Sequence, residues 1–326
     1  MRVLLVKLSS LGDVVHSLPA AMDLQGQVPG VQVDWVVEPA FAPLLKLCPA
    51  VKRIIPCNLR QWRKSFWQAD TQRAWQAFKH DLQATAYDAV IDLQGLTKSA
   101  LISRLATLTP NGKRYAMANR TEGSGYEAPT RWVADVAIPC EWHSHALDRS
   151  RHVCGQALGY SLPSQLQAGL QATPHADVLP TTVALVYGSS RADKAWPLAH
   201  WQVLGQALQA QGFQLALPHA SDAELQTAQA VASACPGAVI WPRCDLVELT
   251  QRLAACAGVV GVDSGVSHIA VALGLPHVQI YNFDTAWRTG PKGFDWQQSV
   301  FAMPTPSPEA VLSVFAACMA SRAQQV

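Results

Sequence analysis

The first residue whose type and position suit catalysis is Asp13, in the stretch SSLGD at 9–13. A short apolar run, VLLV, precedes it and an amphipathic stretch, VVHSLPAAMDLQ, follows, so the carboxylate stands in a predicted strand-to-helix turn. A partly desolvated carboxylate at such a place can accept a proton from a substrate hydroxyl. Aspartate is also a common helix cap, worth about 1 kcal/mol, so the residue by itself leaves both roles open.

A second polar turn lies in VYGSSRADKAWP, at 186–197. Ser189 and Ser190 offer backbone N–H groups and hydroxyls, and Lys194 adds a positive charge before Pro197 opens a helical stretch. Oriented donors with a cation at a helix start suit a phosphate. A polar surface loop with a solvated lysine has the same composition, so this turn alone does not decide the matter.

A third turn lies in VGVDSGVSHIAVALGLP, at 260–276. An apolar run ends at Asp263, and Ser264 and Gly265 open a helical stretch that carries His268 in its first turn. A helix N-terminus attracts anions, and a carboxylate can accept hydrogen bonds from sugar hydroxyls. A helix cap beside a partly buried histidine would explain one such turn, but two in the same half of the chain favour a diphosphate-linked sugar.

A basic segment, NLRQWRKSFWQADTQRAWQAFK at 58–79, mixes cations with aromatic residues. Arg60, Arg63 and Lys64 stand among tryptophan and phenylalanine side chains, a combination that suits an anionic, amphipathic partner such as a lipid head group. A solvated helix with a packed aromatic face is the alternative interpretation. Lys98, after the run DAVIDLQG, and Arg120 extend the same set of cations.

These turns must be positioned by a framework of strands and helices. Short β-branched runs alternate with longer amphipathic stretches through nearly the whole chain, which is typical of parallel sheets covered by helices. The predicted strands are 3–6, 31–37, 52–56, 88–94 and 113–117 in the first half, and 183–188, 213–218, 238–242, 258–263 and 277–282 in the second.

The alternation breaks across 119–180, which separates two repeats of the pattern. We therefore predict an α/β protein with two doubly wound, Rossmann-like domains whose sheets are mainly parallel, at 1–178 and 179–326. The last helix, around 307–324, packs either in the second domain or back on the first. Ligands of such sheets bind at the strand-to-helix turns, here in a predicted cleft between the domains.

Composition narrows the function classes. Of 326 residues, 49% are apolar and 15% are charged, and the net charge of +2 gives no general attraction for nucleic acid. Eight cysteines without CxxC or Cys/His spacing suit free thiols in a reducing cytoplasm. No apolar run approaches the roughly 20 residues of a membrane span. The sequence has neither G-x-G-x-x-G nor a Walker A motif, which disfavours a nicotinamide or ATP-hydrolysing enzyme.

Six motifs occur in an order that resembles the lipopolysaccharide heptosyltransferases, and within that family the heptosyltransferase I enzymes. The likeness spans almost the entire chain, and the N-terminal motif is the most diagnostic. The motifs are VKLSSLGDVVHSLPA, WVVE, RQWRK, YDAVIDLQGLTKSA, DKAWP and the whole third turn. The chain departs from the family at Asn282 and Phe283, where members often carry glycine and proline, and at Cys244, where a larger apolar residue would touch adenine.

The resemblance implies a GT-B glycosyltransferase of lipopolysaccharide core biosynthesis. Such an enzyme moves L-glycero-D-manno-heptose from ADP-heptose to the inner Kdo of Kdo2-lipid A, with inversion and with no metal or other cofactor. It acts as a cytoplasmic protein, peripheral on the cytoplasmic face of the inner membrane. The alternatives are another heptosyltransferase or ADP-sugar transferase with a different acceptor, or a catalytically silent nucleotide-sugar binding protein.

The resemblance also implies a role for each candidate residue. The first domain binds the acceptor and carries Asp13 as the general base, and the second binds ADP-heptose. The implied donor-binding residues are Ser189, Ser190, Lys194, Glu224, Asp263, Ser264, Gly265 and His268. The implied acceptor-binding residues are Arg60, Arg63, Lys64, Lys98 and Arg120.

Overall fold

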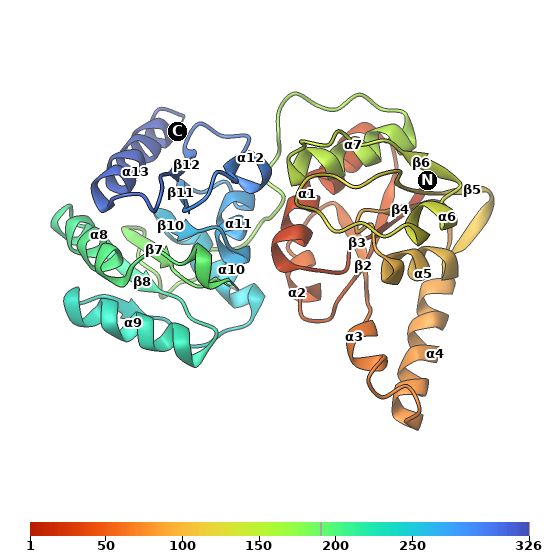
Figure 1. Cartoon of the computed structure of the whole chain (residues 1–326), viewed down its shortest axis with the longest axis horizontal. Coiled ribbons are helices and arrows are strands. Elements are labelled where there is room, and N and C mark those ends of the chain that lie inside the picture. The colour runs from red at the N-terminus through yellow and green to blue at the C-terminus, as the bar shows by residue number, and fades with distance from the viewer. Residues whose placement is uncertain (190, 326) are drawn as a thin grey trace. The chain divides into compact units, whose positions relative to one another are not determined.

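The computed structural model describes residues 1–189 and 191–325. Its contacts divide the chain into two compact units, Met1–Ser164 and Gln165–Val326. Each unit is built on a six-stranded sheet, and every recorded strand pairing is parallel (Figure 1). The predicted α/β class with two doubly wound parallel sheets is confirmed.

The first sheet has the strand order β3-β2-β1-β4-β5-β6. Its central strand β1 (Arg2–Val6) is apolar and buried because neighbouring strands and helices surround it. The strand order reverses between β1 and β4, and ligands of doubly wound sheets bind outside the carboxyl ends of the strands at this switch point. The other strands are β2 (Gln32–Val37), β3 (Val51–Pro56), β4 (Ala86–Asp92), β5 (Thr107–Met117) and β6 (Val136–Ile138).

Helices α1 and α7 pack together in this unit and are joined by a buried ion pair. Arg151 Nε donates to Asp23 Oδ2 over 2.5 Å, and both side chains are at most 7% exposed. Removing one partner would leave a buried charge unpaired, which is costly. The pair therefore fixes α1, whose first turn carries Asp13, to α7. The helices of the unit are α1 (Leu11–Gln27), α2 (Ala42–Leu45), α3 (Leu59–Trp62), α4 (Ala69–Gln83), α5 (Thr97–Leu105), α6 (Pro129–Val133) and α7 (Ala146–Leu158).

The second sheet has the order β12-β11-β10-β7-β8-β9, with its switch point between β7 and β10. The turns that carry Lys194 and Asp263 follow these two strands, so the fold brings them to one edge of the sheet. The strands are β7 (Thr182–Val186), β8 (Gln214–Leu217), β9 (Val239–Ile240), β10 (Gly258–Val262), β11 (His277–Tyr281) and β12 (Gln297–Phe301).

Helices cover this sheet as well, and the last of them, α13, packs on α8, β11 and β12. Val311, Phe315 and Cys318 of α13 are buried in the core of the second unit, although the sequence left open packing on the first. The helical elements are η1 (Ala192–Lys194, a 3-10 turn), α8 (Leu198–Ala210), α9 (Asp222–Ala234), α10 (Leu246–Ala254), α11 (Gly265–Ala272), α12 (Ala286–Thr289) and α13 (Pro308–Ala323).

The boundary between the units differs from the predicted one. The contacts place it between Ser164 and Gln165, fourteen residues before the predicted division at 178/179. The segment 165–178 belongs to the second unit because its backbone is bonded there: Leu170 N donates to Ala272 O over 3.1 Å, and His175 N donates to Gln251 O over 3.0 Å. This polar segment forms neither helix nor strand, so its sequence carries no pattern that assigns it to a unit.

Candidate active site

Asp13 lies in the first turn of α1, at the N3 position of a capping box whose N-cap residue is Ser10. Its Oδ2 atom accepts hydrogen bonds from both the backbone N–H and the hydroxyl of Ser10, each over 2.9 Å. The carboxylate has a second oxygen, and 40% of the side chain is exposed. One oxygen therefore serves the cap, and the other remains accessible to a substrate hydroxyl.

A buried lysine stands beside that second oxygen. Lys7, at the end of β1, is 4% exposed. Its Nζ atom donates to the Leu93 carbonyl over 3.0 Å and lies 3.8 Å from Asp13 Oδ1. Burial alone would raise the pKa of the Asp13 carboxyl, but the Lys7 charge, the two Ser10 hydrogen bonds and the Arg149 charge from α7 together lower that pKa below its usual range. The carboxyl is therefore held ionised and ready to accept a proton.

The turn after β4 brings Lys98 to the same place. Asp92 accepts hydrogen bonds from the N–H groups of Gln94 and Gly95 and from the Ser99 hydroxyl, over 2.8, 3.1 and 2.8 Å, and these bonds fix the turn. Gly95 has a φ of +77°, which other residues adopt with strain. Lys98 Nζ then donates to Ser9 Oγ over 2.9 Å, so this cation reaches the turn that carries Asp13.

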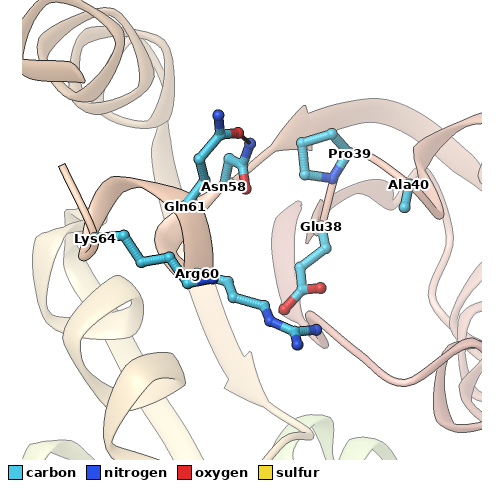
Figure 2. A pocket seen from close by; sticks show the side chains of 7 residues that line it. All are labelled: Glu38, Pro39, Ala40, Asn58, Arg60, Gln61 and Lys64. Carbon is cyan, nitrogen blue, oxygen red and sulfur yellow. Dashed lines mark hydrogen bonds between the residues drawn. The ribbon is translucent and has the colours of Figure 1, made fainter.

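A polar pocket of about 370 Å³ opens where β2 and β3 end. Figure 2 shows the Arg60 guanidinium pointing toward the Glu38 carboxylate, while Lys64 lines another part of the wall. Glu38 also lies 3.4 Å from Lys98 Nζ, which links the pocket to the edge that holds Asp13. The full lining is Glu38, Pro39, Ala40, Asn58, Arg60, Gln61 and Lys64.

Two of the predicted acceptor residues are not brought into this pocket. Arg63, the C-cap residue that follows α3, is exposed and does not line the pocket. Arg120 is exposed in the segment after β5, next to Thr121, whose hydroxyl accepts a 2.8 Å hydrogen bond from buried Arg149. Of the five predicted cations, Arg60 and Lys64 line the pocket and Lys98 reaches its Glu38 wall.

In the second unit, Lys194 and Asp263 form an ion pair, with Nζ and Oδ2 2.6 Å apart. Asp263 is 4% exposed, and its other oxygen accepts from Gln279 Nε2 and Thr289 Oγ1, each over 3.3 Å. His268 Nε2 also lies 3.3 Å from that oxygen. Burial opposes ionisation, but His268 and Lys194 hold the pKa of the Asp263 carboxyl well below its usual range. The buried Asp263 carboxylate thus fixes the positions of the Lys194 ammonium and the His268 ring.

The start of α11 agrees with the predicted helix cap. Ser264 is the N-cap, its hydroxyl accepts from Ser267 N over 3.4 Å, and Gly265 begins the helix. The Ser267 hydroxyl donates to the Val262 carbonyl over 2.6 Å and so ties the helix to β10. The backbone N–H groups of this turn are therefore held in place at the edge where Lys194 stands.

Glu224, in the first turn of α9, lies against the turn that follows β7. Glu224 Oε2 accepts from Ala220 N over 2.6 Å and from Ser221 N over 3.3 Å, so this residue closes the cap of α9. Its carboxylate lies against Gly188, where even a methyl side chain would clash. Ser189 Oγ accepts from Arg191 N over 3.2 Å. Ser190, the remaining predicted donor residue, lies outside the described residues.

Comparison with known proteins identifies the family. Residues 75–308 match the model of "Glycosyltransferase family 9 (heptosyltransferase)". The chain belongs to glycosyltransferase family 9. This family 9 enzyme is 38% identical over 296 residues to lipopolysaccharide heptosyltransferase 1 of Pseudomonas aeruginosa, covering 90% of its own length and 82% of that protein. The predicted family and the predicted glycosyltransferase activity are confirmed.

Solved structures of a heptosyltransferase have the same fold as the family 9 chain over its whole length. Two structures of the Escherichia coli heptosyltransferase WaaC are each 32% identical to it and cover 100% of both chains. One contains ADP and has a TM-score of 0.84, and the other contains ADP-2-deoxy-2-fluoro heptose and has a TM-score of 0.77. The predicted GT-B fold class is therefore confirmed.

Several site residues of the family 9 enzyme escaped the sequence analysis. Lys7 looked like the polar end of an apolar strand, and its contact with Leu93 spans 86 residues of sequence. Glu38 and Gln61 lie within the motifs WVVE and RQWRK, but neither residue type by itself indicated a role, and Asn58 lies just before the second motif. Gln279 did carry a signal: it is a polar residue in the fully buried strand HVQIY, and a buried amide requires hydrogen-bond partners.

Proposed function

We propose that this family 9 glycosyltransferase moves L-glycero-D-manno-heptose from ADP-heptose to the inner Kdo of Kdo2-lipid A, in lipopolysaccharide core biosynthesis. The relatives named above support heptose transfer, and the ADP and ADP-heptose analogue bound to WaaC support the donor. One observation carries the proposal: the two switch points hold different groups. The first has a part-exposed carboxylate whose Oδ1 lies 3.8 Å from the Lys7 ammonium, and the second has a lysine paired with a buried carboxylate.

The proposed reaction is a single displacement with inversion. The acceptor hydroxyl gives its proton to Asp13 Oδ1 while its oxygen forms a bond to the anomeric carbon of the heptose. The bond from that carbon to the diphosphate oxygen breaks, and ADP leaves with the electron pair. The Lys194 ammonium offsets the charge that builds on the leaving diphosphate. The proposed donor residues beside it are Ser189, Ser190, Glu224, Asp263, Ser264, Gly265 and His268.

The acceptor is proposed to bind on the first unit. Kdo2-lipid A carries carboxylates and phosphates, and Arg60 and Lys64 in the pocket suit such anions, together with Arg63, Lys98 and Arg120. In Figure 1, α3 and the neighbouring end of α4 stand away from the sheet of this unit. Trp67 between them is 77% exposed and Phe66 is 52% exposed, which supports peripheral contact with the cytoplasmic face of the inner membrane. Among the described residues, no helix is both long and apolar enough to cross a membrane.

Mass-spectrometric detection of heptose added to Kdo2-lipid A tests the proposal. Transfer to Kdo2-lipid A, and not to an already heptosylated acceptor, is the expected result. Transfer only to the heptosylated acceptor, or of another ADP-sugar, would overturn the substrate assignment. Binding of ADP-heptose with no turnover on any acceptor would indicate a silent nucleotide-sugar binding protein instead.

Replacing Arg60, Arg63 and Lys64 together with alanine should raise the acceptor KM and leave ADP-heptose affinity nearly unchanged. These cations lie in the first unit, whereas the proposed donor residues lie in the second. The attraction should also weaken with salt in the wild type, because screening acts over about 8 Å at physiological ionic strength.

A charge-matched control for this triple variant replaces Lys52, Arg73 and Lys113, which are exposed in the same unit and do not line the pocket. Steady-state kinetics and calorimetry compare the two sets. An equal rise in acceptor KM for both would show general charge attraction, and a matching loss of donor affinity in the first set would place the cations elsewhere.

Lys7→Met should move the acid limb of the pH profile of acceptor kcat/KM to higher pH. The Lys7 charge lowers the pKa of Asp13, so its loss raises that pKa, and the base is then protonated at a higher pH as the pH falls. Ser10 and Arg149 still favour the ionised form, so some activity at neutral pH should remain. Lys52→Met is the control, and a lower rate with an unshifted limb would show that Lys7 acts only on structure.

A further inference from the structure

The lysine proposed to face the donor diphosphate stands on a very short element. Helix η1 has only three residues, Ala192–Lys194, and its turn is closed by backbone bonds of 3.2 Å from Lys194 N to Arg191 O and 3.1 Å from Ala195 N to Ala192 O. None of its residues is buried. Three residues in a 3-10 turn do not hold a long side chain by themselves, so the position of Lys194 requires support from outside the turn.

Asn282 supplies such support from the end of β11. Its Nδ2 group donates to the carbonyl of Asp193 over 3.1 Å and to the carbonyl of Ala195 over 2.9 Å. These carbonyls belong to the residues immediately before and after Lys194. Both hydrogens of one amide therefore bracket the backbone of Lys194 and fix it to the strand.

The amide is itself anchored. Asn282 Oδ1 accepts a 2.7 Å hydrogen bond from the Thr305 hydroxyl. The hydroxyl donor orients the amide oxygen and so directs the NH₂ group at the two carbonyls, the only arrangement that gives every atom a complementary partner. Strands β10 and β11 are neighbours, with Val262 opposite Ile280. Lys194 is thus held at its ammonium by Asp263 after β10 and at its backbone by Asn282 after β11.

We infer that Asn282 is a positioning residue that clamps η1 and so aims Lys194 at the donor diphosphate. The inference rests on the proposed function for the task of Lys194, and Asn282 acts through Lys194 without touching the substrate. The hydrogen bonds of Asn282 agree with this assignment. The residue is half-buried, and its described bonds go to the two carbonyls on either side of Lys194 and to the Thr305 hydroxyl.

Asn282→Leu in a double-mutant cycle with Lys194→Met tests the inference. Leucine keeps the approximate size and adds no charge, but it has no donor for either carbonyl. We expect kcat/KM for ADP-heptose to fall between about tenfold and about a hundredfold when the lysine is present, since misplacement by about 1 Å has effects of this size. In the Lys194→Met background the same change should cost less than about twofold, because the side chain that it positions is gone.

Two further variants keep the test decisive. Thr305→Val removes only the anchor of the amide, so it should cause a smaller loss that also disappears in the Lys194→Met background. Gln298→Leu removes an exposed amide that likewise donates to a backbone carbonyl of the second unit, and it should have no effect. ADP affinity by calorimetry and melting temperatures accompany each variant, and if Asn282→Leu unfolds, Thr305→Val carries the cycle.

The outcomes separate the inference from the function on which it rests. Equal losses from Asn282→Leu in both backgrounds would overturn the positioning role while leaving the role of Lys194 intact. Wild-type turnover by Lys194→Met itself would instead remove Lys194 from the proposed mechanism. A loss that follows melting temperature in all variants would reduce Asn282 to a stabilising contact.

Discussion

Asp13→Asn should lower kcat by roughly 10²-fold to 10⁴-fold, the range for loss of a general base, and change the melting temperature little. A single oxygen, Oδ2, accepts both Ser10 hydrogen bonds. Asparagine retains one such oxygen, and a neutral amide oxygen can serve at the N3 position of a capping box as a carboxylate does, so the turn should stay folded. Its amide cannot take the proton of the acceptor hydroxyl, so the chemical step should fail.

Two companion variants separate the cap from the base. Asp13→Ala loses both functions, so its turnover and its melting temperature should fall together. Ser10→Ala removes the hydroxyl of the N-cap residue of α1 and leaves the backbone bond to Asp13, so it should lower the melting temperature while turnover changes little. ADP affinity, measured by calorimetry, should persist in all three because the proposed donor residues lie in the other unit. Turnover close to the wild-type rate in Asp13→Asn would end the assignment of Asp13 as the base.

The strands that carry this site could be predicted because their signal is local. VLLV, VALV and GVVGV are short apolar runs with β-branched residues, and the structure has β1, β7 and β10 at these places. The position of each polar turn followed directly, since a parallel sheet brings the carboxyl ends of its strands to one edge. The short strand β6, with three residues and one buried side chain, had too weak a pattern to be found.

The contacts of the site could not be predicted in the same way. The residue type does not show whether Asp13 stabilises a helix end or takes part in the reaction. That depends on the surroundings of each carboxylate oxygen: Oδ2 accepts from Ser10, and Oδ1 lies near Lys7. The ion pair of Lys194 with Asp263 joins residues 69 apart in sequence, and the bonds of Asn282 to the Lys194 turn span 87 and 89. Only the packing of neighbouring strands brings such residues together.

The contacts of Asp263 limit the role that the sequence predicted for it. The sequence indicated a carboxylate free to bind sugar hydroxyls, but its oxygens already accept bonds from Lys194, Gln279 and Thr289. A buried carboxylate with these partners fixes the cation next to it. Gln279 marks this network in the sequence, because β11 is buried along its whole length and a buried glutamine requires hydrogen-bond partners.

Lys194→Ala should lower kcat by about 10²-fold to 10³-fold, as does the loss of one group that stabilises a developing negative charge. ADP affinity should fall by less, since the interaction strengthens as the diphosphate departs. Lys194→Arg keeps the charge but replaces a compact ammonium by a planar fork, so it should restore only part of the rate.

The structure adds a competing explanation for such a loss, because Lys194→Ala also removes the ammonium paired with buried Asp263. That carboxylate keeps Gln279 and Thr289 as donors, so we expect a lower melting temperature but a folded protein. If Lys194 only neutralised Asp263, ADP affinity, turnover and stability would all decline in proportion. A fall in kcat that clearly exceeds the loss of ADP affinity places the ammonium in the transition state, and wild-type turnover in the alanine variant would exclude it from the reaction.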